Sequence, residues 1–84
     1  MARIKKNFAG SYSILRPDGT VVATIENGDV AELDDRREWL VTYYRHETGV
    51  GWVVFDGDTF PTKRMAKEYA MNYAKTLMTT TAGY

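Results

Sequence analysis

The sequence predicts a small α+β domain in which an antiparallel β-sheet is covered on one face by a single C-terminal helix. Two observations predict this class. Short segments between residues 11 and 56 alternate apolar with polar residues or are rich in β-branched and aromatic ones, and residues 62–77 repeat apolar side chains at helical spacing. The chain has 84 residues, of which 44% are hydrophobic and 26% charged, enough for one globular core. The expected order is β-β-(short element)-β-β-α.

The first expected element is a β-hairpin made by residues 11–15 and 20–25. The connecting Arg-Pro-Asp-Gly has the residues of a tight turn, because proline presets φ, aspartate accepts a local main-chain hydrogen bond and glycine tolerates positive φ. Alternation along the first strand places Tyr12 on the buried side and leaves Ser11 and Ser13 in solvent. An Asn-Gly pair ends the second strand.

A second hairpin follows a segment that the sequence does not settle. Residues 29–38 fit a short helix, a brief strand or a loop, with strand or loop favoured. Residues 39–45 are aromatic and β-branched, and a glycine-containing turn leads them back into residues 51–56. The Asp-Gly-Asp sequence at 56–58 is expected to end this last strand in a turn.

The closing helix begins after Pro61, with Thr62 as its N-cap. One helical face is apolar, and its small alanines favour close approach to a sheet. This face contains Ala66, Tyr69, Ala70, Tyr73, Ala74 and Leu77. The expected organisation is therefore a basic arm over residues 1–10, a single domain over residues 11–78 and a frayed tail over residues 79–84.

The composition argues against catalysis and against a bound cofactor. There is no cysteine, and the only histidine, His46, lies in an expected turn, so no metal cluster is predicted. The paired acids at 34–35 and 56–58 are explained by turn formation rather than by a pocket. No apolar run approaches the length that spans a bilayer. We therefore expect a non-enzymatic cytoplasmic protein without a metal, cofactor, membrane or small-molecule substrate.

Charge is the most uneven property of the chain. The net charge is zero, yet cations gather at both ends and acids in the middle. On a helical wheel, Arg64, Lys67 and Lys75 lie opposite the apolar stripe, with Met71 among them. Cations near a helix N-terminus and on a flexible arm favour phosphate groups. The predicted nucleic-acid set is Arg3, Lys5, Lys6, Lys63, Arg64, Lys67 and Lys75.

The C-terminal half resembles the three-stranded-sheet-plus-helix DNA-binding domains, such as the plant apetala-type domain and the arm-binding domains of phage integrases. The resemblance is carried by Trp39, the Gly-Val-Gly-Trp at 49–52, the Thr-Phe-Pro-Thr at 59–62 and the closely spaced alanines of the helix. The same helix looks like the last helix of double-stranded-RNA-binding domains. The resemblance implies a DNA contact through the exposed sheet face, where only Arg16 and Arg45 supply guanidinium groups.

Two functions follow from these observations. The favoured hypothesis is a non-catalytic interaction module, of the kind that phages and mobile elements encode as accessory or inhibitory proteins, which binds a protein partner or a second copy of itself. The alternative is a DNA-binding domain that contacts phosphates through the arm and the outer helix face. The predicted protein-interaction set is Asp34, Asp35, Glu38, Tyr44, Trp52 and Met71.

Overall fold

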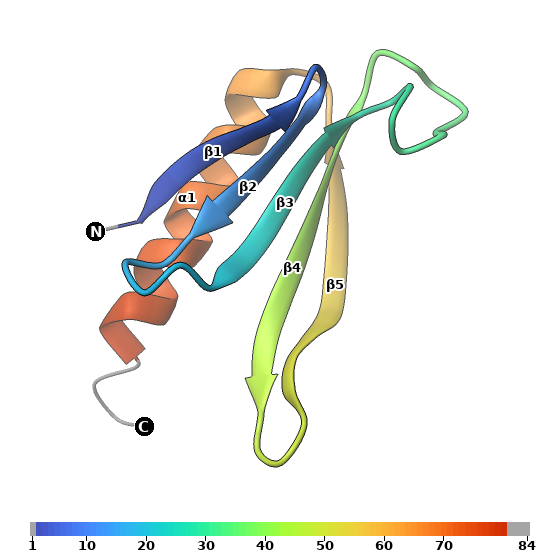
Figure 1. The fold of residues 1–84 in the computed structure, drawn as a ribbon. Coiled ribbons are helices and arrows are strands. Elements are labelled where there is room, and N and C mark those ends of the chain that lie inside the picture. Colours follow the sequence, from blue (N-terminus) through green and yellow to red (C-terminus); the bar gives the residue numbers. More distant parts are fainter. Residues whose placement is uncertain (1, 81–84) are drawn as a thin grey trace.

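The computed structural model describes residues 2–80 of the chain, and the side chains of residues 2–76. It contains a five-stranded antiparallel sheet followed by one helix, which confirms the predicted α+β class (Figure 1). The strands lie in the sheet in chain order, so each pairs with its sequence neighbours. The elements are β1 Arg3–Phe8, β2 Ser11–Leu15, β3 Val21–Asn27, β4 Trp39–Glu47, β5 Gly51–Phe60 and α1 Lys63–Thr80.

The N-terminal segment is a strand, so the prediction of a flexible arm over residues 1–10 is wrong. β1 pairs antiparallel with β2, with Lys5 opposite Ser13 and Lys6 opposite Tyr12. The sequence pattern did not indicate this strand, because charged residues replace the alternation of apolar and polar residues that marks the other strands. An edge strand needs no apolar face, since its residues are exposed, and charged residues such as lysine are common on such edges. The sheet therefore has five strands instead of the expected four.

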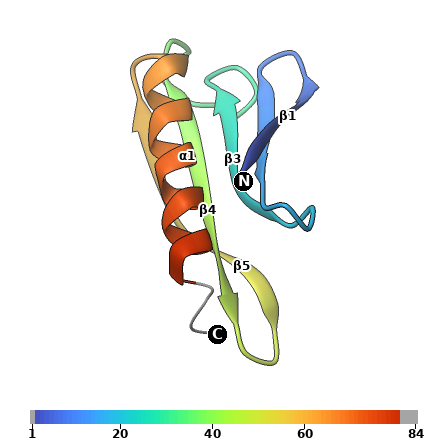
Figure 2. The same cartoon turned by 90° about the vertical axis from the view of Figure 1, so that its left-hand side faces the viewer.

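The core lies between α1 and one side of the sheet, which we call the helix face (Figure 2). The other side, the open face, has no helix over it in the described part of the chain. Strand residues Ile14, Ala23, Ile25 and Val41 are fully buried on the helix face. They meet Ala66, Ala70 and Ala74, which are also fully buried. Because alanine has so short a side chain, the helix backbone approaches the sheet closely.

Thr62 caps the helix as predicted, because its Oγ1 accepts a hydrogen bond from the Met65 main-chain N–H at 3.2 Å. Of the two tyrosines expected in the core, only Tyr73 is half-buried, and its hydroxyl donates to the Tyr44 carbonyl oxygen. Tyr69 is 53% exposed and stacks on Phe60 at 4.7 Å between ring centroids. Its burial prediction is wrong because Tyr69 lies on the flank of the helix, above the β5 edge.

The first hairpin turn forms as the sequence predicts. The Thr20 main-chain N–H donates to the Asp18 carboxylate at 2.9 Å, and Gly19 has φ +90°. Ser11 and Ser13, however, are 5% and 8% exposed, which overturns their placement in solvent. They do lie on the open face, but the Asn7 side-chain amide covers them, donating to Ser13 Oγ at 2.9 Å and to Ser11 Oγ at 3.4 Å.

Residues 29–38 form an irregular loop without a helix or strand, which settles the segment that the sequence left open. The loop folds back onto its own start at Gly28. A Cβ atom there would lie 2.6 Å from the Arg36 Cα, so only glycine fits this close approach. The Asn27 side chain accepts a hydrogen bond from the Val30 main-chain N–H at 2.8 Å, which holds the first turn.

The last strand continues through Asp56, Gly57 and Asp58 to Phe60, so the prediction of a turn there is wrong. These residues lie opposite β4, with Asp56 across from Tyr43 and Asp58 across from Val41. A bulge beside Tyr43 absorbs one extra residue of β5, and pairing with the nine-residue β4 outweighs the local turn preference. Of the predicted frayed tail, residues 79 and 80 belong to α1 and residues 81–84 lie outside the described residues.

Candidate functional site: a basic surface beside the β1 edge

Tyr12 and Lys63 form the centre of the candidate site. Tyr12 projects from β2 onto the helix face, and Lys63 opens α1. The Lys63 ammonium donates a hydrogen bond to the Tyr12 hydroxyl at 2.6 Å and lies 4.3 Å from the ring centroid. The Trp39 ring packs on the same tyrosine at 6.5 Å between centroids. The pair therefore ties the helix N-terminus to the β1 side of the sheet.

Three lysines act electrostatically on the Tyr12 hydroxyl. The hydrogen bond from Lys63 is the largest cause that lowers the pKa of Tyr12 below its ordinary value of 10.0. Desolvation is the second-largest effect and raises this pKa, whereas the charges of Lys63, Lys6 and Lys67 lower it further. Lys6 comes from β1 and Lys67 from the second turn of α1. The tertiary structure has thus gathered positive charge from two elements, β1 and α1, around one phenol on β2.

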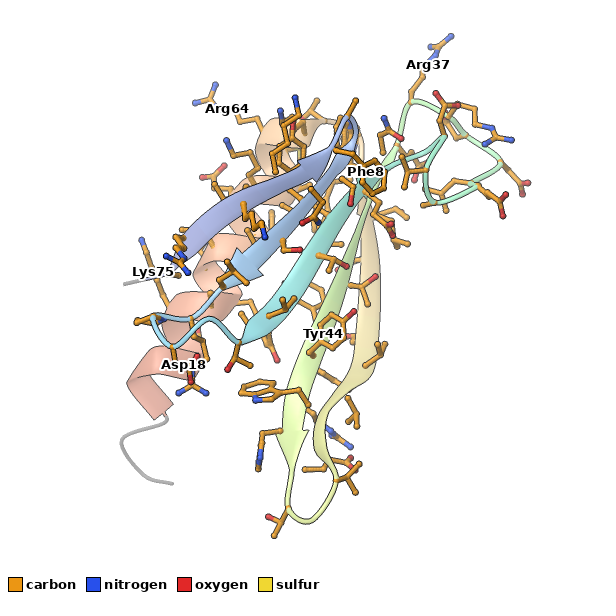
Figure 3. The ribbon with its side chains drawn as sticks, viewed as in Figure 1. Phe8, Asp18, Arg37, Tyr44, Arg64 and Lys75 are labelled. Carbon is orange, nitrogen blue, oxygen red and sulfur yellow. The ribbon has the colours of Figure 1, made fainter. Side chains whose placement is uncertain are left out.

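The cations continue along α1, where the helix surface is hollowed into a shallow groove of about 700 Å³. No acidic residue occupies the first turn of α1, so the positive end of the helix dipole is not neutralised there. We call Lys6, Lys63, Arg64, Lys67 and Lys75 the basic surface. Arg64 and Lys75 lie beside α1, away from the loop that carries Arg37 (Figure 3). The residues lining the groove are Lys63, Arg64, Lys67, Glu68, Met71, Asn72 and Lys75.

The structure divides the predicted nucleic-acid set between the two faces of the sheet. Lys6 lies on the helix face with Tyr12, whereas Lys5 lies opposite Ser13 on the open face, and alternation puts Arg3 beside Lys5. Lys63 is half-buried against Tyr12, which corrects the interpretation of it as a free cation on the outer helix face. Five of the seven predicted cations therefore share one surface, and two do not.

The predicted protein-interaction set is scattered. Tyr44 and Trp52 belong to the β4–β5 hairpin, whereas Met71 lies on α1 and packs against the core. All three side chains are half-buried. Trp52 is enclosed by the Arg16 guanidinium, 5.4 Å from its ring centroid, and by the ring of His46 at 5.7 Å. These side chains pack within the protein instead of forming one surface.

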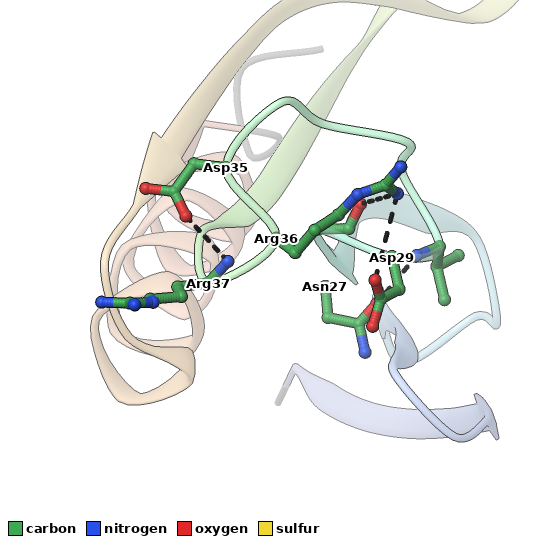
Figure 4. A network of polar contacts seen from close by, with 7 residues as sticks. Asn27, Asp29, Asp35, Arg36 and Arg37 are labelled. Atoms are coloured by element: carbon green, nitrogen blue, oxygen red, sulfur yellow. Dashed lines mark hydrogen bonds and ion pairs between the residues drawn. The ribbon is translucent and has the colours of Figure 1, made fainter.

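The acidic members of that set lie in the loop of residues 29–38, where short-range contacts hold the chain (Figure 4). Arg36 lies 3.9 Å from the Asp29 carboxylate and donates to the Gly28 carbonyl oxygen at 3.3 Å. The Asp35 carboxylate accepts a hydrogen bond from the Arg37 main-chain N–H at 2.9 Å. Asp34 is exposed and Glu38 half-exposed. The loop is thus partly neutralised and lies apart from Tyr44, Trp52 and Met71.

Sequence reasoning missed several features of the surface. It assigned Tyr12 only to the core, since nothing local links it to Lys63, 51 residues away. It also missed the exposed apolar side chains of the two outer strands. Phe8 is 58% exposed and Phe55 43% exposed. A period-2 pattern indicates which residues share a face, but it does not indicate where the helix stops covering that face.

Comparisons with known proteins identify no relative: no family model, curated protein or solved structure matches the chain. Within the described residues, no helix is both long enough and apolar enough to cross a membrane. The same residues contain no group of three or more histidine, aspartate or glutamate side chains placed to hold a metal ion. The basic surface is therefore interpreted from its own geometry.

Tyr12 is expected to ionise at a lower pH than Tyr43, whose pKa is raised by burial and by the nearby Asp58 and Asp56 carboxylates. Between the folded pKa of Tyr12 and 10.0, the unfolded chain binds more protons at this group. Its contribution to the free energy of unfolding therefore grows as pH rises through that window, and is lost as pH falls through the folded pKa. Ultraviolet absorbance of the phenolate follows the titration.

Single substitutions test whether lysines on the two faces of β1 differ in their effect on the pKa of Tyr12. Y12F should remove the earliest phenolate signal, and K63M and K6M should each raise the pKa of Tyr12. K5M is the matched control, because Lys5 is the neighbour of Lys6 on the opposite face and should leave the titration unchanged. An early signal that survives in Y12F would contradict the cluster.

Proposed function

We propose that this protein binds the phosphate backbone of nucleic acid through the basic surface. The observation that carries the proposal is the convergence of Lys6, Lys63 and Lys67 on Tyr12, continued along α1 by Arg64 and Lys75. Phosphate oxygens are the natural ligands of several ammonium and guanidinium groups beside a helix N-terminus. Glu68 is the only acid among the described residues that line the groove.

The neutral net charge is compatible with this function because the charges are separated in space. The acids of the loop and of β5 lie away from the basic surface, so the local field over α1 is positive. The open sheet face offers little for base readout, since the row across its centre, Ser13, Thr24 and Thr42, has no cation besides Lys5 at its end. The proposed contact is therefore with the backbone rather than with base edges.

The structure favours this function over the protein-interaction hypothesis on one ground. Five of the seven residues predicted to bind nucleic acid lie on the basic surface, whereas the residues predicted to bind a protein do not share one surface. A binding surface requires side chains that a single partner can reach together. The acidic loop, Trp52 and Met71 come from different elements. In the basic surface, by contrast, the four α1 cations line one groove, and Lys6 acts on the same Tyr12 hydroxyl as Lys63 and Lys67.

The test measures binding of a short labelled duplex and of a single strand by fluorescence anisotropy. The variant K6Q/R64Q/K67Q removes three positive charges from the basic surface. The matched control R36Q/R37Q/R45Q removes three positive charges elsewhere, so both proteins have the same net charge. We expect the first variant to bind at least about tenfold more weakly. Its salt slope should fall by about 0.9 for each phosphate that it no longer neutralises.

The control separates a local contact from a general attraction between charges. R36Q/R37Q/R45Q should bind like the natural chain, because none of its three residues belongs to the basic surface. Equal weakening in the two variants would show that only net charge matters. Absence of binding to both probes at about 50 mM salt, where phosphate contacts are strong, would end the proposal.

A further inference from the structure

The two outer strands of the sheet carry opposite charges. β1 contains Arg3, Lys5 and Lys6 without an acid, and β5 contains Asp56 and Asp58 without a cation. Each strand pairs on one side only, so its outer main-chain N–H and C=O groups point away from the sheet. All of β1 and residues 54–59 of β5 are exposed. Both edges are thus accessible to another strand.

The charged side chains of the two edges lie on opposite faces of the sheet. Lys5, opposite Ser13, is on the open face together with Arg3. Asp58, opposite Val41, is on the helix face, and so is Asp56. The ion pairs of Arg36 with Asp29 and of Arg45 with Glu47 involve none of these edge residues.

We propose that β1 of one copy pairs antiparallel with β5 of a second copy. An antiparallel match of these two edges turns the second copy over, so that the open face of one sheet continues the helix face of the next. This rotation of the second copy brings the Arg3 and Lys5 side chains of one molecule to the same side of the joined sheet as the Asp56 and Asp58 carboxylates of the other. The spacing of two residues is common to both edges, so Arg3 lies opposite Asp58 while Lys5 lies opposite Asp56.

The apolar residues of the edges extend the match. Phe8 lies opposite Ser11 and therefore on the open face, and it follows Lys5 towards the end of β1 (Figure 3). Phe55 contacts Tyr73 and therefore lies on the helix face, and it precedes Asp56. In the proposed pairing these two exposed rings reach the same side of the joined sheet. Their contact adds burial of apolar surface to the two ion pairs.

The other possible pairings of edges are less favourable. Two β1 edges would place cations against cations, and two β5 edges would place carboxylates against carboxylates. A parallel match of β1 with β5 keeps the faces aligned, so only Lys6 would reach the side of Asp56 and Asp58. Parallel ladders are also slightly less stable than antiparallel ones. Charge and direction together select the proposed arrangement.

The interface is heterologous, because it joins two different edges. Every added copy leaves one β1 and one β5 free, so the assembly grows with concentration instead of closing as a dimer. The proposed phosphate contact does not use this interface, since Lys6 and the α1 cations lie on the other side of β1 from Arg3 and Lys5. Failure of one proposal leaves the other standing.

Sedimentation equilibrium at low salt over a series of protein concentrations tests the pairing. The natural chain should show an average mass that rises with concentration to at least twice that of the monomer and falls when salt is added. The charge-reversed edges R3D/K5D and D56K/D58K should each remain monomeric, because β1 and β5 then have the same sign. An equimolar mixture of the two variants should associate, and so should the fourfold variant R3D/K5D/D56K/D58K.

A matched control separates the edges from net charge. R36D/R37D changes the net charge as much as R3D/K5D does, but its residues lie in the loop, so it should associate like the natural chain. Circular dichroism verifies that each variant is folded, which is expected because all the substituted residues are exposed. The proposal is overturned if the natural chain stays monomeric, or if either charge-reversed variant associates as strongly as the natural chain. It is also overturned if both the mixture and the fourfold variant stay monomeric.

Discussion

The substitution I25A should lower the free energy of unfolding by about 2–5 kcal/mol. Ile25 is fully buried in the central strand β3, between Tyr12 on β2 and Val41 on β4. Removing most of this side chain leaves a cavity beneath α1, and the pleated backbone on both sides cannot move in to fill it. The free energy of unfolding of a natural domain is only about 5–15 kcal/mol, so the expected loss is a large part of the total stability.

Urea denaturation followed by circular dichroism measures this effect. V54A is the matched control, because Val54 is also an apolar strand residue but is 59% exposed on β5. It should change the free energy of unfolding by no more than about 0.5 kcal/mol. Equal destabilisation by V54A and I25A would contradict the placement of the core on the helix face.

The substitution A70L should destabilise the protein by about 1–3 kcal/mol through the opposite mechanism, overpacking. Ala70 is fully buried where α1 lies against the sheet. A larger side chain must push the helix outward, since the strand residues below it are themselves closely packed. The displacement should also weaken the hydrogen bond from Lys63 to Tyr12, so we expect the pKa of Tyr12 to rise in the same variant.

The control for this variant places the same residue on the exposed side of the helix. Asn72 is exposed, and leucine is the better helix former of the two residues, so N72L should be neutral or slightly stabilising. Thermal denaturation compares the two proteins, and phenolate absorbance compares the Tyr12 titrations. An A70L protein as stable as N72L, with an unchanged Tyr12 pKa, would show that the helix does not depend on alanine at this contact.

Local signals predicted most of the fold. The turn before Thr20 and the N-cap at Thr62 are decided within a few residues, and hydrogen bonds to Asp18 and Thr62 confirm both. The strands of both hairpins were recognisable because their residues alternate apolar with polar or are rich in β-branched and aromatic side chains. β1 was missed for the converse reason, since an exposed edge strand has no such pattern.

The candidate site was less predictable than the fold. The sequence identified the cations but not their grouping. A one-residue step along a strand reverses the face, so the neighbours Lys5 and Lys6 are separated by the sheet once β1 is known to be a strand. Similarly, the apparent turn residues Asp56 and Asp58 became edge residues only when pairing with β4 extended β5 past them. Their position on this edge is what allows their negative charge to take part in the proposed pairing with β1 of a second copy.

The sequence by itself determined the α+β class, the two hairpins, the N-cap and the alanine stripe of the helix, because each depends on residues close together in the chain. The tertiary structure alone decided that Lys63 meets Tyr12, 51 residues earlier, and that positive charge borders one edge of the sheet while negative charge borders the other. The physical reason is that strand pairing and helix docking fix which distant side chains share a surface, and charge acts through that distance in space rather than along the chain.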